Sequence, residues 1–272
     1  MSSLIHPNAY VHPEAQLGNN VKVGPGATID AGCIIGDDCE IRNNAVITGG
    51  TIMGQGNQIG YCAIIGSEPQ DRSFTGQPSH VEIGNRNIIR EHVTIHRGAK
   101  PGAVTRLGDD CFLMTGCHMA HDTRVGSRVT MVNNVLLAGY VEVRDGAFLG
   151  GASVIHQHVR VGELAIMRGQ TRISKDVPPY FMAADTNLMT GLNRVGMRRA
   201  GLSAASIRVV QHAYHILFAE GRNVTQSLEE LQKELGHEPE VRQIIDFIST
   251  SKRGICRGVS KRGVKDENEF TG

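Results

Sequence analysis

From position 5 to position 173, with two interruptions, the chain carries an aliphatic residue or a methionine at every sixth position. The series holds without a miss from position 5 to 65, resumes from 83 to 95, and runs again from 107 to 173. A period of six matches neither the turn of an α-helix nor the two-residue alternation of a long strand. It is typical of hexapeptide-repeat parallel β-helices, in which each hexad forms one flat side and one corner of a prism.

Three hexads make one coil of such a prism, so we expect positions i and i+18 to stack on successive coils. The aliphatic residue fills the narrow interior, and a small residue four positions later, as at Ala27 and Ala45, packs near the corner. Glycine or asparagine then relieves backbone strain at the turn. The repeat predicts a mainly β fold, a parallel β-helix over residues 1–180. Similarity to known hexapeptide-repeat proteins further implies a left-handed coil and a trimer, which the spacing alone does not show.

The repeat is interrupted near 67–82 and near 100–106, in polar stretches that contain proline and glycine. After each interruption the aliphatic series resumes in the same frame of six. We expect both interruptions to be excursions from the prism that carry function. The pattern ends at 176–180, and helical periodicity follows at 202–219, 224–235 and 240–250. We therefore predict an α-helical C-terminal domain over 181–258 and a disordered tail over 259–272.

Composition narrows the class of protein. With 28 Lys+Arg against 27 Asp+Glu the chain is near neutrality, so wholesale nucleic-acid binding is not expected. No apolar run approaches the length of a membrane span, and no signal peptide precedes the repeats, which predicts a cytoplasmic protein without an integral membrane segment. The six cysteines form no CxxC pair, and we interpret them as buried small residues in a reducing compartment.

The period also predicts which side chains are neighbours. Positions i and i+18 lie on successive coils about 4.8 Å apart, so His121 is expected beside Gly139 and Asp122 beside Tyr140. His121 should point outward into a cleft, and a glycine beside it leaves a backbone N–H unobstructed. A base next to such an N–H is the minimal arrangement for acyl transfer: the base deprotonates the nucleophile and the N–H stabilises the oxyanion. The alternative, a surface histidine without chemistry, stays open.

Several other histidines raise the possibility of a zinc site, because neutral imidazole is a common zinc ligand. No histidine pair has the spacing of five found in the zinc-binding γ-class carbonic anhydrases, and no cysteine joins the cluster. We therefore expect neither a metal nor another cofactor. A zinc-binding or non-catalytic trimer is kept as the least favoured alternative.

Four segments, at 83–98, 117–122, 155–157 and 176–180, resemble the UDP-N-acetylglucosamine acyltransferases of lipid A biosynthesis. The arginine pair at 198–199 and the ending at 251–257 fit the same family, so the resemblance covers residues 1 to 257. It implies a homotrimer with active sites between subunits, acyl carrier protein as donor of a 3-hydroxyacyl chain, and the 3-hydroxyl of UDP-N-acetylglucosamine as acceptor. That transfer is the first step of lipid A biosynthesis.

The same resemblance assigns catalytic roles to three residues. His121 corresponds to the general base, Asp122 to the residue that orients it, and Gly139 to the oxyanion donor. The reaction is then a direct transfer without an acyl-enzyme. Cys117 takes the small-residue position of its hexad and is expected to be buried and inert.

Substrate contacts are implied as well. Gln70 and Asp71 correspond to contacts with the nucleotide sugar, and His118 to a residue at the donor and sugar site. Asn193 and Arg199 correspond to uridine and diphosphate contacts made by the adjoining subunit. On the donor side the residues implied are His156 and Gln157, at the acyl-pantetheine and substrate, and Gly169, where acyl-chain length is limited.

Three positions depart from the family pattern: Tyr140 stands where a histidine is usual, Ser73 where a lysine is usual, and Val195 where an acidic residue is usual. All three fall among the sugar-nucleotide contacts, Tyr140 included. The alternative function is therefore an N-acyltransferase, or an acyltransferase that acts on a 3-amino or other nucleotide sugar and forms an amide.

Overall fold

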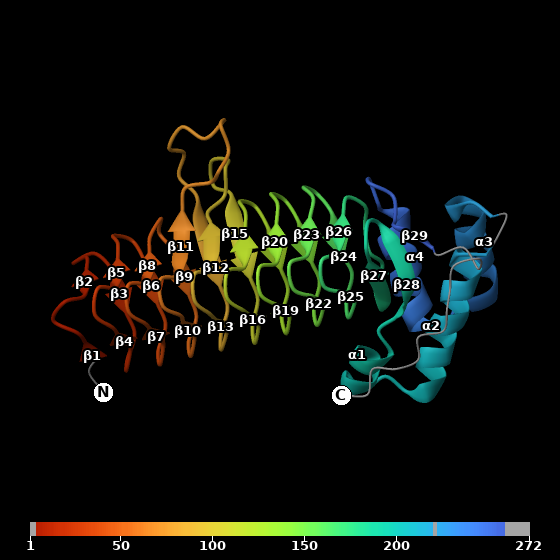
Figure 1. The fold of residues 1–272 in the computed structure, drawn as a ribbon, viewed down its shortest axis with the longest axis horizontal. Coiled ribbons are helices and arrows are strands. Elements are labelled where there is room, and N and C mark those ends of the chain that lie inside the picture. Colours follow the sequence, from red (N-terminus) through yellow and green to blue (C-terminus); the bar gives the residue numbers. More distant parts are fainter. Residues whose placement is uncertain (1–3, 220–221, 259–272) are drawn as a thin grey trace.

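The computed structural model describes residues 4–219 and 222–258. Its main body is a long three-sided prism of short parallel strands, followed by four helices at the C-terminal end (Figure 1). The first strand of each side pairs with the strand one coil later, as Leu4 with Lys22 and Tyr10 with Thr28. The predicted coil of three hexads and the left-handed parallel β-helix are confirmed.

Each side of the prism is one sheet. Sheet A contains β1 (Leu4–Ile5), β4 (Lys22–Val23), β7 (Glu40–Ile41), β10 (Gln58–Ile59), β13 (Ile88–Ile89), β16 (Phe112–Leu113), β19 (Thr130–Met131), β22 (Phe148–Leu149), β25 (Ile166–Met167), β27 (Phe181–Ala184), β28 (Leu188–Leu192) and β29 (Arg257–Gly258). Sheet B contains β2 (Tyr10–Val11), β5 (Thr28–Ile29), β8 (Val46–Ile47), β11 (Ile64–Ser67), β14 (Thr94–His96), β17 (His118–Met119), β20 (Leu136–Leu137), β23 (Val154–Ile155) and β26 (Arg172–Ile173). Sheet C contains β3 (Gln16–Leu17), β6 (Ile34–Ile35), β9 (Ile52–Met53), β12 (His80–Ile83), β15 (Val104–Leu107), β18 (Arg124–Val125), β21 (Glu142–Val143) and β24 (Arg160–Val161).

The aliphatic residue of each hexad lines the interior, and Ile29, Ile47 and Ile65 are fully buried. The small residues Ala27 and Ala45 are fully buried at the corners, as expected. Hydrophobic burial of these columns stabilises the prism, because every coil covers the apolar surface of the coils on either side.

The glycine that directly follows an aliphatic residue has a different role from the one expected. A Cβ at Gly60 would lie 2.5 Å from the carbonyl carbon of Arg90 on the next coil, so glycine is needed there for space. The left-handed backbone falls later in the hexad, as at Asn44 (φ 58°) and Tyr140 (φ 60°). Because the coil imposes this conformation even on tyrosine, the turn residue cannot be recognised from composition alone.

Both interruptions of the repeat leave the prism as excursions. One runs from β11 to β12 and the other from β14 to β15, so both leave the corner between sheets B and C. Ile64 pairs with Thr94, and Thr94 pairs with His118, so the chain takes five hexads and then four to complete these two coils. The excursions therefore add two hexads and one hexad to the regular coil and leave the hexad register unchanged. Figure 1 shows both projecting from the same edge.

The segment after residue 180 begins with strands rather than a helix. β27 pairs with β25 and then with β28, which extends sheet A through residue 192. The helices are α1 (Arg194–Arg199), α2 (Ala204–Leu217), α3 (Val224–Leu235) and α4 (Pro239–Ser249), and the last three confirm the predicted helical segments. The predicted tail at 259–272 lies outside the described residues. Within the described residues, no helix combines the length and apolar character needed to cross a bilayer.

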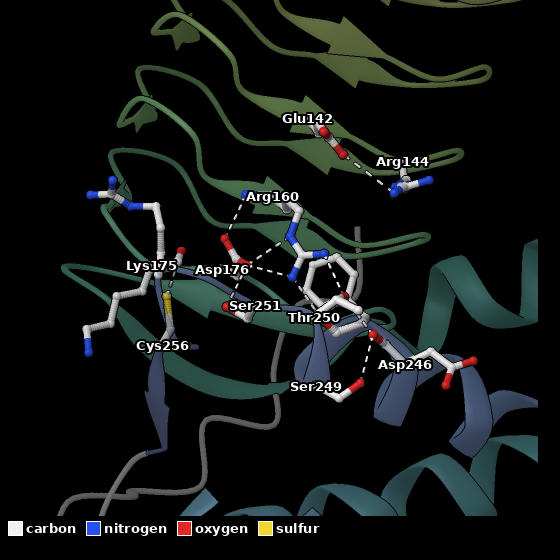
Figure 2. A network of polar contacts seen from close by, with 12 residues as sticks. Glu142, Arg144, Arg160, Lys175, Asp176, Asp246, Ser249, Thr250, Ser251 and Cys256 are labelled. Atoms are coloured by element: carbon white, nitrogen blue, oxygen red, sulfur yellow. Dashed lines mark hydrogen bonds and ion pairs between the residues drawn. The ribbon is translucent and has the colours of Figure 1, made fainter.

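A buried ion pair joins the helices to the end of the prism (Figure 2). The Asp176 side chain, 1% exposed, accepts hydrogen bonds from the backbone N–H and the guanidinium of Arg160, at 2.8 to 3.0 Å. Arg160 also donates to the Phe247 carbonyl at the end of α4 (2.8 Å), and Ser251 donates to Asp176 (2.8 Å). The segment that follows α4 is therefore fixed against the last coil.

Candidate active site

His121 and Asp122 form a hydrogen-bonded pair at the corner between sheets B and C. They lie between β17 and β18, and the Nδ1 of His121 is 2.8 Å from the Oδ2 of Asp122. A carboxylate accepts the Nδ1 proton, which leaves Nε2 as the free basic nitrogen. The His121 residue is only 5% exposed, whereas an open cleft was expected. The reason is that both excursions fold over this corner.

The Asp122 side chain is held from the second excursion. Its Oδ2 also accepts the Ala99 N–H (3.0 Å), and the Asp122 N–H donates to the hydroxyl of Thr105 (2.8 Å). Neither partner was predicted, because the conformation of an irregular loop leaves no periodic signal in the sequence. With these bonds in place the carboxylate has one orientation toward His121.

Gly139 lies directly against His121, as the coil of three hexads predicts. A Cβ built on Gly139 would be 2.6 Å from Cε1 and 2.7 Å from Nε2 of the imidazole. Gly139 is itself buried, so the imidazole covers the glycine that was expected to be open. Among the described residues, no group accepts the Gly139 N–H. The corner thus pairs a basic nitrogen with an uncommitted backbone donor.

Asp71 reaches the same corner from the first excursion. Its Oδ2 lies 4.0 Å from the Nε2 of His121, and Ser73 donates both its N–H and its hydroxyl to Oδ1, each at 2.9 Å. The Ser73 hydrogen bonds lower the pKa of Asp71, so it is a carboxylate at neutral pH. Gln70, the neighbouring predicted contact, is exposed.

A second histidine pair lies on the outer surface of sheet B. The Nδ1 of His118 is 2.7 Å from the Thr94 hydroxyl, and its ring is perpendicular to that of His96 at 4.9 Å between centroids. Burial, and then the neighbouring His118, lower the pKa of His96 to about 4. Burial and His121 lower the pKa of His118. Both rings therefore stay neutral near pH 7, which avoids a cluster of like charges beside His121.

Tyr140 lies on the other side of His121. The two rings are perpendicular, with centroids 5.3 Å apart. His158, which sequence reasoning did not select, stacks on Tyr140 with 4.6 Å between centroids and 8° between planes. His158 follows Tyr140 by one coil of three hexads, and this spacing could have identified it as a neighbour of Tyr140.

His156 and Gln157 are exposed on the coil after Gly139. Arg253, from the segment after α4, places its Nη2 3.2 Å from the Nδ1 of His156. A groove of about 1050 Å³ runs along the corner from Asp122 to the C-terminal segment, and its lining includes Asp122, Tyr140, His158, Lys252 and Arg253. Lys252 and Arg253 lie far along the chain from Asp122, and only the fold brings them to the groove.

Three residues predicted to contact the substrates lie away from His121 in the structure. Gly169 is exposed where the chain turns from sheet A into sheet B, and a Cβ there would meet nothing closer than 3.4 Å. Asn193 is buried and caps α1, accepting the Gly196 N–H at 2.8 Å and donating to Leu164 at 2.8 Å. Arg199 ends α1, at the C-terminal end of the molecule (Figure 1). One chain alone does not bring these residues to His121.

Among residues 4–219 and 222–258, no three histidine, cysteine or acidic side chains gather so as to hold a metal ion. Cys117 is fully buried, and burial raises the pKa of its thiol to about 11. The residues present fit base-assisted transfer between two substrates better than nucleophilic catalysis by a thiol.

Comparison with known proteins gives consistent matches at both ends of the chain. The family model described as Udp N-acetylglucosamine O-acyltransferase, domain 2, matches residues 176–256. The model described as bacterial transferase hexapeptide (six repeats) matches residues 2–31.

Curated relatives carry the name acyl-[acyl-carrier-protein]--UDP-N-acetylglucosamine O-acyltransferase. The chain is 39% identical over 211 residues to the one from Burkholderia orbicola, covering 75% of this chain and 80% of that protein. It is 41% identical over 198 residues to the one from Alkalilimnicola ehrlichii, covering 72% and 76%.

Solved structures extend the similarity to nearly the whole molecule. The UDP-N-acetylglucosamine acyltransferase of Francisella novicida superimposes with a TM-score of 0.91 at 32% identity, covering 98% of this chain and all of that one. The Arabidopsis enzyme of the same name superimposes with a TM-score of 0.84 at 34% identity, covering 93% and 100%.

Proposed function

This chain belongs to the UDP-N-acetylglucosamine O-acyltransferase family, and we propose that it transfers a 3-hydroxyacyl chain from acyl carrier protein to the 3-hydroxyl of UDP-N-acetylglucosamine. This reaction would be the first step of lipid A biosynthesis, carried out in the cytoplasm. The observation that carries the proposal is the contact between the His121 ring and Gly139, with Asp122 hydrogen-bonded to the far nitrogen of the ring.

The proposed mechanism is direct transfer. Nε2 of His121 takes the proton of the sugar 3-hydroxyl as the oxygen attacks the thioester carbonyl. The attack forms the C–O bond and an oxyanion that the Gly139 N–H stabilises, and collapse of this oxyanion restores the carbonyl and cleaves the C–S bond. The imidazolium returns the proton to the departing thiolate, so the products are the ester and the free carrier thiol. Asp122 keeps Nδ1 protonated and stabilises the imidazolium.

The remaining site residues are proposed as substrate contacts. Gln70, Asp71 and His118 would contact the reacting end of the sugar, and His156 and Gln157 would contact the acyl-pantetheine of the donor. No cofactor or metal takes part in this scheme.

The active unit is proposed to be a homotrimer. Beside the site, sheets A and B present apolar outward side chains, with Phe148 and Ile88 38% exposed on A and Leu136 and Val154 41% exposed on B. Sheet C presents charged ones, the outward residues of β12, β15, β18, β21 and β24 being Glu82, Arg106, Arg124, Glu142 and Arg160. Two apolar faces and one charged face suit a three-fold assembly that buries A and B. Gly169, Asn193 and Arg199 would then reach a neighbour's site.

An acceptor panel tests the function. Purified protein with 3-hydroxyacyl carrier protein is given UDP-N-acetylglucosamine or its 3-amino analogue, and the product is identified by mass spectrometry. We expect an ester from the first acceptor, and a roughly 10²–10⁴-fold loss of kcat in His121→Ala. Size-exclusion chromatography with light scattering should give three chains.

The same panel decides between the alternatives. A product formed only from the amino sugar would replace the ester assignment by N-acylation, which the departure at Tyr140 makes worth testing. Stoichiometric zinc in protein prepared without chelators, or unchanged turnover in His121→Ala, would favour the zinc-binding or non-catalytic trimer.

A further inference from the structure

Arg97, at the start of the second excursion, contacts the end of β11, where the first excursion leaves the prism. Its Nη1 donates to the Gly66 carbonyl (3.1 Å), its backbone N–H donates to the Ser67 carbonyl (3.0 Å), and its Nη2 lies 3.4 Å from a carboxylate oxygen of Glu68. The side chain is only 16% exposed. A Cβ at Gly49, two coils earlier, would lie 2.9 Å from Nη1, so a glycine there leaves room for the guanidinium. The Arg97 side chain therefore extends back across the base of the first excursion.

The same guanidinium also lies over a ring in the middle of the first excursion. Its carbon is 5.3 Å from the centroid of the Phe74 ring. Phe74 closes a turn with Asp71, because the Phe74 N–H donates to the Asp71 carbonyl at 3.0 Å. Within this turn Ser73 donates its N–H and its hydroxyl to the Asp71 carboxylate, each at 2.9 Å. The cation–π contact at Phe74 therefore fixes the turn that carries Asp71, whose Oδ2 lies 4.0 Å from Nε2 of His121.

One short segment thus holds a carboxylate near each nitrogen of the His121 ring. Arg97 fixes the turn of Asp71, which lies near Nε2. Two residues later, the Ala99 N–H donates to the Asp122 carboxylate at 3.0 Å, and Asp122 is the partner of Nδ1. Loss of the guanidinium would free the first excursion and leave the Ala99 contact in place.

We propose that Arg97 is a positioning residue that holds the first excursion over His121 and thereby places Asp71 in the acceptor site. It acts through Phe74 and the turn that ends there, rather than on the reacting atoms. Arginine suits this role because a planar guanidinium can bind a carbonyl along its edge and a ring on its face at the same time. The inference deepens the proposed function and rests on it for the effect on the nucleotide sugar, whereas the hold on the excursion can be measured without substrate.

Three variants test these contacts. Arg97→Met keeps an unbranched apolar side chain without the guanidinium, Arg97→Lys keeps a cation without the planar group, and Phe74→Ala removes the ring from the other side of the contact. The matched control is Arg42→Met, at the corner between sheets A and B. Arg42 also pairs with a carboxylate, that of Glu40 at 3.2 Å, and also lies over a ring, that of Tyr61 at 5.5 Å. Circular dichroism and oligomeric state are compared for all four.

Hydrogen exchange measured by mass spectrometry follows the excursion in the protein without substrate. In Arg97→Met and Phe74→Ala, amides in residues 68–79 should exchange about 10-fold faster than in wild type, because the closed excursion loses one of its contacts. Arg97→Lys should lie between Arg97→Met and wild type. Peptides from the regular coils should be unchanged in all variants, and Arg42→Met should leave residues 68–79 as in wild type. Unchanged exchange of residues 68–79 in both Arg97→Met and Phe74→Ala, or faster exchange along the whole prism, would overturn the proposal.

Kinetics separates a positioning role from a general structural one. We expect the KM of UDP-N-acetylglucosamine to rise about 10-fold in Arg97→Met and in Phe74→Ala, since the acceptor would bind only those molecules whose excursion is closed. The kcat at saturating sugar and the KM of the acyl carrier protein donor should stay within about threefold of wild type. An unchanged sugar KM in the presence of faster exchange would overturn the link to the acceptor site. A wild type that forms no product with either acceptor would count against the proposed function, and hydrogen exchange would still decide whether Arg97 holds the excursion.

Discussion

At the scale of single residues, the proposed catalytic corner depends on the absence of a side chain at Gly139 as much as on the side chains of His121 and Asp122. Gly139 has no side chain, and the imidazole of His121 occupies the space that a Cβ would fill. Gly139 is not among the residues with positive φ, so an alanine there is compatible with the backbone conformation. Its cost would come from the collision with His121 alone.

We therefore expect Gly139→Ala to fold and to lose about 10²-fold or more in kcat, because the base must leave its position. Circular dichroism measures whether the variant folds, and steady-state kinetics measures its kcat. Gly151→Ala is the matched control, since a Cβ there would meet nothing closer than 3.3 Å, at Cγ1 of Val132. Full activity in Gly139→Ala would contradict the assigned geometry.

A second residue-scale prediction concerns pH and stability. His96 is buried, its Nδ1 has no partner within the described residues, and burial lowers its pKa from 6.5 to about 4. Between these values the unfolded chain binds a proton that the folded chain does not, so stability falls as pH falls. The loss attributable to His96 is about 3 kcal/mol once the pH is below 4.

Denaturant unfolding between pH 7 and 4 tests this effect. His96→Asn should flatten the dependence of unfolding free energy on pH, whereas His92→Asn, at an exposed position, should leave the dependence as in wild type. Equal slopes for wild type and His96→Asn would show that other groups control acid stability.

At the scale of elements, the coils on either side of the excursions are joined by a buried amide ladder. Asn57 accepts the N–H and side-chain amide of Asn87, both at 2.9 Å, and Asn87 accepts the Cys111 N–H at 2.8 Å. Both asparagines are fully buried. The ladder supplies hydrogen bonds inside the prism at the corner between sheets C and A, on the coils that carry the excursions at their B–C corner.

Removing one asparagine side chain from this ladder should lower the free energy of unfolding. Asn87→Ala leaves the Cys111 N–H without its partner and removes one of the two donors to the Asn57 oxygen, and we expect a loss of about 2 kcal/mol in unfolding free energy. The exposed Asn43 offers a control, because Asn43→Ala removes an amide that solvent can replace. Equal stability of the two variants in denaturant titrations would exclude a structural role for the ladder.

At the scale of the whole molecule, the helical region does more than cover the end of the prism. Arg160 and Asp176 fix the segment after α4 to the last coil (Figure 2). That segment carries Lys252 and Arg253 to the groove. Asp176 is buried at 1% exposure, so its charge depends on Arg160 for compensation.

Arg160→Met should therefore destabilise the protein by about 3–5 kcal/mol, because a buried charge loses its partner. Adding Asp176→Asn should recover part of that loss. The exposed pair Arg128–Asp145, at 3.2 Å, gives the control: Arg128→Met should cost less than about 1 kcal/mol. Thermal or denaturant unfolding of Arg160→Met, of the double variant and of Arg128→Met measures these three changes in the free energy of unfolding, and the first two belong to a double-mutant cycle. No recovery in the double variant would rule out the charge as the cause.

The hexad period determined the prism, its coil of three hexads, its interior residues and the contact between His121 and Gly139. It could do so because stacking on a regular coil is a property of spacing along the chain. The three later helices were predictable for the same reason, since each buries a periodic apolar face.

Tertiary structure alone decided the rest. Asp71 reaches His121, and Ala99 reaches Asp122, through irregular excursions whose backbone follows no period, and closure of these excursions buries a histidine that spacing placed in the open. Arg253 meets His156, far away along the chain, because Asp176 and Arg160 fix the C-terminal segment. Spacing determines which residues stack, whereas contacts between a loop and a coil depend on packing and hydrogen bonds that form only once the chain has folded.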